Sequence, residues 1–109
     1  EMWWLEASVT QYTIIQITAQ AAFQKYAHQI KFIIMCWSPD HLTIDWQLLQ
    51  TIRKSGLDIP LITIGEKMGA TNSKRFWQNA HFIDNDQVKR LNRHHQSFDL
   101  IHDHVYIVK

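Results

Sequence analysis

Two short apolar runs separated by an amphipathic stretch constrain the fold of this chain more than any other feature. The runs are residues 32–36 (FIIMC) and 61–64 (LITI), and both have the length of a strand. Runs that are apolar at nearly every position are typical of strands in a parallel sheet covered on both faces. We therefore expect both runs to lie inside an α/β fold.

The stretch between the runs predicts an amphipathic helix within residues 41–56. Its apolar residues recur at three- and four-residue steps, which places them on one helix face: Leu42, Trp46, Leu49 and Ile52. Gly56 follows Lys54 and is expected to end the helix. A strand, a helix and a second strand thus follow one another.

The same alternation continues through the rest of the chain. Residues 12–17 (YTIIQI) are expected to form a strand, with Thr18 as the N-cap of a following helix. Further expected elements are a short helix capped by Ser73, a strand at 81–83, a helix over 87–101 and a last strand at 104–108. The pattern predicts one doubly wound α/β domain over residues 1–109.

Composition excludes several classes of protein. Of the 109 residues, 46% are hydrophobic and 19% charged, which is typical of a globular domain. The formal net charge is +1 and the basic residues are scattered, so we expect no direct contact with nucleic acid. The single cysteine excludes an internal disulfide framework, and no apolar run is long enough to span a membrane. We expect a cytoplasmic protein.

Candidate site residues follow the strands, because ligands of doubly wound sheets gather at the carboxyl ends of strands. Three segments qualify: residues 36–40, which end in Asp40; residues 65–71, which begin with Gly65 and Glu66; and residues 84–86. Asp40, Asp84 and Asp86 either form an acidic pocket at the edge of the sheet or are present because aspartate stabilises turns.

Residues 32–66 resemble the middle of the bacterial response-regulator receiver domain. The closest part is WQLLQTIRKSGLDIPLITI, with the family's helix pattern followed by a proline that opens the next strand. The resemblance implies a flavodoxin-like three-layer sandwich with a parallel central sheet flanked by helices. It also implies that the first strand lies before residue 1, or that the segment VYIVK supplies it.

The positions that handle phosphate in receiver domains hold other residues here. The phospho-accepting aspartate falls on Met35 or Trp37, depending on the side from which one counts, with Cys36 between them. None of these can form an acyl phosphate. Asp84-Asn85-Asp86 replaces the family's Lys-Pro pair, and no acidic pair follows an apolar strand ahead of Tyr12.

Such departures resemble the pseudo-receiver domains of transcription activators, hybrid sensor kinases and clock proteins. The resemblance implies a non-catalytic signal-transduction module that works through a protein partner or a homodimer, is excised from a larger protein, and controls an attached output domain. It implies no cofactor and no enzymatic activity. The sequence itself shows no Gly-rich phosphate loop and no nucleophile–base pair.

An alternative is a small metal- or redox-sensing domain. His94, His95, His102 and His104 have a spacing that can bind zinc or copper. Cys36 could sense oxidants, although a free cysteine in a strand is more often a small buried hydrophobic residue.

Tryptophans are the last group of candidates. Trp3, Trp4 and Trp77 lie near ends or loops, and such aromatic residues favour partner docking when they are exposed. Burial within the domain is the other interpretation.

Overall fold

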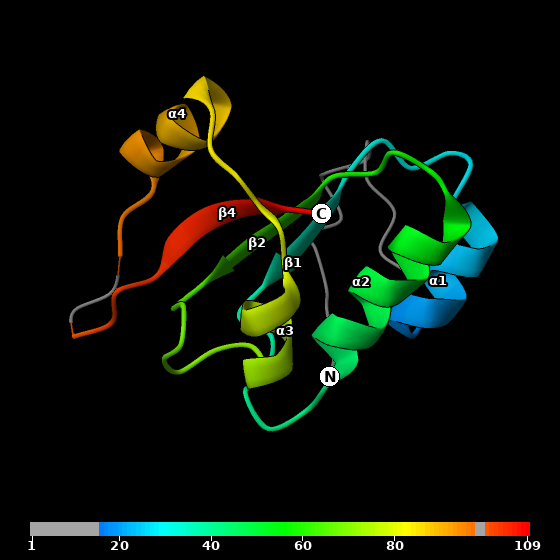
Figure 1. The fold of residues 1–109 in the computed structure, drawn as a ribbon, viewed down its shortest axis with the longest axis horizontal. Coiled ribbons are helices and arrows are strands. Elements are labelled where there is room, and N and C mark those ends of the chain that lie inside the picture. Colours follow the sequence, from blue (N-terminus) through cyan, green and yellow to red (C-terminus); the bar gives the residue numbers. More distant parts are fainter. Residues whose placement is uncertain (1–15, 98–99) are drawn as a thin grey trace, which may run out of the picture.

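The computed structural model describes residues 16–97 and 100–109 (Figure 1). Its helices and strands alternate along most of the chain, as expected. The elements in order are α1 (Ala19–Tyr26), β1 (Ile33–Cys36), α2 (Ile44–Ser55), β2 (Leu61–Gly65), α3 (Lys74–Asn79), β3 (Phe82–Ile83), α4 (Asp86–His94) and β4 (His104–Val108). The strand expected at residues 12–17 lies mostly outside the described residues, and Gln16 and Ile17 are not part of a strand.

The four described strands form one mixed sheet in the order β1-β2-β4-β3. β1 and β2 are parallel, whereas β4 is antiparallel to both of its neighbours, β2 and β3. The expectation of a wholly parallel sheet is therefore wrong. The C-terminal strand enters the middle of the sheet between β2 and β3, so it does not stand in for a first strand beside β1.

Local sequence signals set the helix ends. The Thr18 hydroxyl accepts a hydrogen bond from the amide of Ala21, and the Ser73 hydroxyl accepts one from Phe76, which confirms both expected N-caps. Gly56 ends α2 in the left-handed region at a φ of 72°. Only glycine adopts that conformation at little cost, so the predicted stop is confirmed.

The hydrophobic core lies between one face of the sheet and helices α1, α2 and α3. Its buried residues come from all three helices, from β2 and β4, and from the turn before β2: Phe23, Leu48, Leu49, Ile52, Ile59, Leu61, Phe76, Trp77 and Val108. Leu42 precedes α2 and is 41% exposed, so its expected place on the core face is wrong. Leu48, which lies within α2, is buried in the core instead.

Helix α4 lies on the other side of β4 from α3 (Figure 1). It ends at His94, although helical spacing in the sequence continues to Ile101, so the expectation of one helix over 87–101 is wrong. Asn92, near the end of this helix, contacts β4. Its side-chain amide donates to the carbonyl of Val105 at 2.9 Å and accepts from the Val105 amide at 2.8 Å. Asn92 thereby continues the hydrogen bonding of β4 past the short strand β3.

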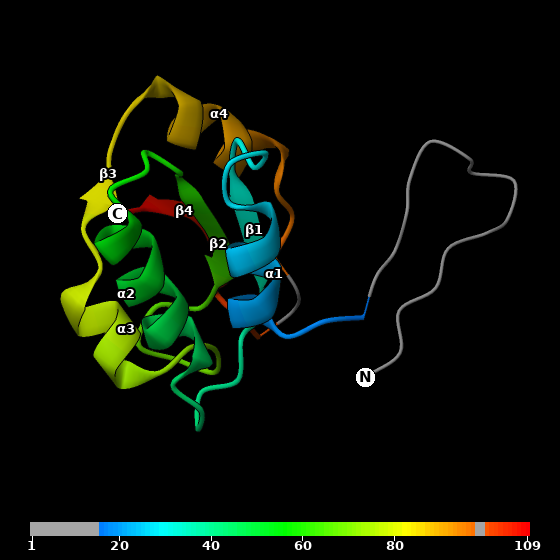
Figure 2. The same ribbon diagram turned by 90° about the vertical axis from the view of Figure 1, so that its right-hand side faces the viewer.

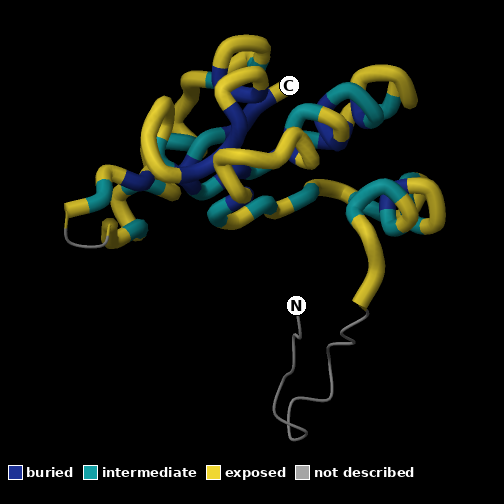
Figure 3. The backbone as a smooth tube through the Cα atoms, turned by 90° about the horizontal axis from the view of Figure 1, so that it is seen from below, coloured by how far each residue is buried: buried dark blue, intermediate teal, exposed yellow. Residues whose placement is uncertain are grey.

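The sheet face opposite the core is covered only in part among the described residues. Val105 and Ile107 of β4 are buried, and Figure 3 shows the buried stretch that leads up to the C-terminus. On β1, on β2 and at the residue before β1, the corresponding side chains are exposed or half-buried: Phe32, Ile34, Cys36, Ile62 and Ile64. We call this surface the open face. Cys36 lies on it and is exposed, which corrects the expectation of a buried cysteine.

Candidate functional site

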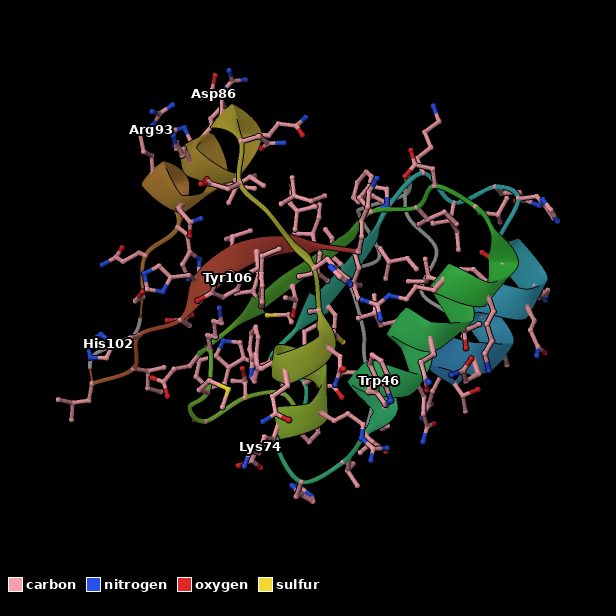
Figure 4. All side chains as sticks on the ribbon, in the orientation of Figure 1. Trp46, Lys74, Asp86, Arg93, His102 and Tyr106 are labelled. Carbon is pink, nitrogen blue, oxygen red and sulfur yellow. The ribbon has the colours of Figure 1, made fainter. Side chains whose placement is uncertain are left out.

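The candidate site is the rim of the sheet at which β1 and β2 end. Because β4 is antiparallel, its first residue also lies here, with His104 paired to Gly65. β3 does not reach the rim, since its last residue, Ile83, pairs with Ile107. In Figure 4, Asp86 lies on α4 at the opposite end of the molecule from Lys74, which borders the rim. Asp84 and Asp86 therefore do not join Asp40 in an acidic pocket.

The loops that follow β1 and β2 are held together by their backbones. The amide of Asn72 donates to the carbonyl of Ser38 at 2.6 Å, and Pro39 and Thr71 form an isolated bridge. Trp37 continues the parallel pairing by donating to the carbonyl of Ile64 at 2.9 Å, and its φ is 53°. The two loops thus form one ordered edge.

Gly65 is needed where these loops meet. The Thr71 hydroxyl accepts from the amide of Glu66 at 2.9 Å and donates to Oδ1 of Asn72 at 2.8 Å. A β-carbon on Gly65 would overlap Oγ1 of Thr71 and Oδ1 of Asn72. The close approach of the strand to this hydroxyl–amide pair explains a glycine inside a strand.

The carboxylate of Glu66 clamps two loops. One oxygen accepts from the amide of Ala70 at 2.8 Å, and the other accepts from the amide of His102 at 2.7 Å. The bonds from the His102 and Ala70 amides stabilise the charged form and hold the pKa of Glu66 below its ordinary value. Both oxygens therefore serve to position the chain.

Asp45 is a buried carboxylate that connects two helices. Its oxygens accept hydrogen bonds from the Ser73 amide at 2.7 Å, the Ser73 hydroxyl at 2.8 Å and the Trp46 amide at 2.7 Å. The residue has no exposed surface. It ties the first turn of α2 to the N-cap of α3. Sequence reasoning missed this role because the partners lie 28 residues apart; the acid in the first turn of the helix is the one local signal.

The buried carboxylate of Asp103 and the half-buried ring of His95 form a second polar contact, at 3.0 Å between Oδ2 and Nε2. Burial raises the pKa of Asp103, but hydrogen bonds from His95 and other groups outweigh this effect, and the pKa lies below its ordinary value. The Ser97 hydroxyl donates to the Asp103 carbonyl at 2.6 Å, so it is not directed at His95 as a nucleophile would be.

The four histidines singled out in the sequence do not gather into one site. His95 contacts Asp103, while Nδ1 of His104 lies 3.0 Å from the carbonyl of His102. Within residues 16–97 and 100–109, no group of three or more His, Cys, Asp or Glu side chains could hold a metal ion. The described part of the chain thus gives the metal-sensor alternative no support.

The remaining candidates lie apart from one another. Met35 packs against the core, Cys36 faces the opposite side of the sheet, and the Asp40 carboxylate lies 3.3 Å from the ring of His41 in an exposed pair. Trp77 is 4% exposed and its indole N–H donates to the Thr71 carbonyl, which removes it from the docking surface. Trp3 and Trp4 lie outside the described residues.

Comparisons with protein-family models, curated proteins and solved structures found no match. No helix in the described part of the chain has the length and apolar character needed to cross a membrane.

Proposed function

We propose that this chain is a non-catalytic regulatory domain with a flavodoxin-like, pseudo-receiver fold, which conveys a signal through protein contacts to an attached transcription-regulator or kinase output domain. The β1-α2-β2 unit supports the resemblance on which this proposal builds. It is parallel, and it coincides with the run of residues 32–66 that resembles receiver domains.

The open face carries the proposal. Ile34 is 60% exposed and Phe32 is 53% exposed, and both belong to a continuous apolar surface with Ile62 and Ile64. Apolar side chains grouped in this way on a sheet are typical of surfaces that another protein segment covers. A regulatory domain that works through contacts needs such a surface.

The rim supports the non-catalytic part of the proposal. Glu66 holds backbone amides with both carboxylate oxygens, and Asp45 is buried among hydrogen bonds between helices. At the end of β1, Cys36 and Trp37 supply no carboxylate. These side chains explain the shape of the rim without any phosphoryl transfer.

Intact-mass measurement after incubation with acetyl phosphate and magnesium tests the proposal. We expect no phosphoryl mass gain, whereas a receiver domain with its aspartate, treated in parallel, should gain one. A base-labile phosphoryl adduct on this chain would overturn the proposal, and peptide mapping would identify the acceptor.

A further inference from the structure

We propose that a partner protein binds a groove beside α4 with an amphipathic helix whose apolar side is flanked by acidic residues. This partner deepens the proposed function, and its role rests on that function's assignment of protein contacts to the open face.

The groove lies between α4 and the starts of β1 and β2, and its volume is about 470 Å³. Its apolar lining includes Phe32 and Ile62, which also belong to the open face, and Leu91 of α4. The groove therefore continues the open face toward α4.

Both sides of the groove carry apolar side chains that the described part of the chain leaves uncovered. On α4, no residue is buried and Leu91 is 39% exposed. On the sheet side, Phe32 is exposed and Ile62 is half-buried. Because burial of apolar surface stabilises association, an occupant that contacts the sheet and α4 together gains from both sides.

The arrangement of layers favours a helix as the occupant. Figures 1 and 2 show α4 on one side of the strands and α2 and α3 on the other. On β1, Ile33 and Met35 pack against the core while Ile34 is exposed on the open face, so the strand is apolar on both faces. Such strands are covered by helices on both faces in α/β folds. Packed helices lie about 8–10 Å apart, so a helix beside α4 would lie along the groove.

The charges of the groove specify the flanks of that helix. Among the described residues that line the groove, the charged ones are Lys31 and Arg90, and none is a carboxylate. Neither cation forms a salt bridge with a described residue. Lys31 precedes β1 and Arg90 lies on α4, so each side of the groove has one cation. Acidic residues along both edges of an apolar helix face would pair with both cations, whereas basic flanks would be repelled.

Two other occupants fit the groove less well. A second copy that met this one groove to groove would bring its own Lys31 and Arg90 against the same pair, and like charges repel. An anionic membrane would attract both cations, but a flat bilayer surface does not reach the floor of a groove between a helix and a sheet.

Binding of two labelled peptides to the full chain, followed by fluorescence anisotropy, tests the chemistry of the partner. Both are synthetic helices of three heptads with leucine at the two core positions of each heptad. One carries glutamate at both flanking positions and the other carries lysine, which keeps each peptide from pairing with itself. We expect the acidic peptide to bind about tenfold more tightly than the basic one, and its affinity to fall as the salt concentration rises.

Charge reversal in the groove provides the specific variant. The double variant Lys31→Glu and Arg90→Glu should reverse the preference, so that the basic peptide binds more tightly. Lys89→Glu with Arg93→Glu makes the same change in net charge on exposed residues outside the groove lining and should keep the preference for the acidic peptide. Circular dichroism checks that both double variants remain folded.

An apolar variant tests the floor of the groove. Phe32→Ser should weaken binding of the acidic peptide by about fivefold or more, because the peptide loses a large apolar contact. Leu42→Ser is the matched control, since Leu42 is also exposed but does not line the groove, and it should leave the affinity unchanged.

Equal binding of the two peptides, no binding of either, or an unchanged preference after charge reversal at Lys31 and Arg90 would overturn the inference. Self-association of the chain that blocks the acidic peptide would also overturn it, in favour of a second copy. Binding to phosphatidylserine vesicles in place of the peptide would overturn it in favour of a membrane. None of these results involves phosphoryl transfer, so the mass measurement still decides the proposed function separately.

Discussion

Replacing Asp45 by alanine should destabilise the domain more than any other change to a single carboxylate at the rim. The substitution removes two hydrogen bonds that join α2 to α3, from the amide and the hydroxyl of Ser73, and it leaves that amide buried without its acceptor. Hydrogen bonds to a charged group contribute about 1.5–3 kcal/mol each, so we expect the loss of these two bonds to cost roughly 3–6 kcal/mol. A domain of this size has about 5–15 kcal/mol of stability in total.

Urea denaturation followed by circular dichroism measures this loss. With a slope of about 1–3 kcal/mol per molar urea, the midpoint should fall by about 1 M or more. Asp45→Asn keeps one acceptor oxygen but turns a donor toward Ser73, and it should lie between wild type and Asp45→Ala. Asp40→Ala is the matched control: its carboxylate is exposed and should change stability by less than about 0.5 kcal/mol. If Asp45→Ala behaved like this control, the carboxylate would not hold α2 and α3 together.

Three further predictions concern residues at or near the rim. Gly65→Ala should cost about 1–3 kcal/mol because the added methyl group overlaps the Thr71 hydroxyl, and combining it with Thr71→Ala should relieve part of that cost in a double-mutant cycle; strict additivity would contradict the contact. His95→Ala should cost about 1–3 kcal/mol in urea denaturation at neutral pH, because buried Asp103 loses its partner; an unchanged midpoint would show that the pair contributes nothing. Glu66 and Asp103 have folded pKa values below their ordinary values of 4.5 and 3.8, so their stabilisation should be complete above those values and be lost as the pH falls through the lower, folded pKa values. Urea midpoints between pH 3 and pH 6 that did not fall on acidification would contradict this sign.

Local patterns predicted the parts of the fold that depend on neighbouring residues. Thr18, Ser73 and Gly56 act within one helical turn, and each was identified from the sequence. The direction of β4 could not be predicted in this way, because a strand sequence does not specify whether its partner runs parallel. The sequence favours a buried Cys36 over an oxidant sensor, because a free cysteine in a strand is usually buried. At the edge of a half-covered sheet, however, the alternate side chains remain exposed.

The contacts at the candidate site also depend on residues far apart in the sequence, which local patterns do not connect. Asp45 and Ser73 are brought together only by the packing of α2 on α3, and Glu66 reaches His102 only because β4 runs antiparallel. No spacing rule in the sequence connects such pairs. The resemblance to receiver domains drew attention to the ends of β1 and β2, but it could not indicate that the carboxylates there hold the loops in place.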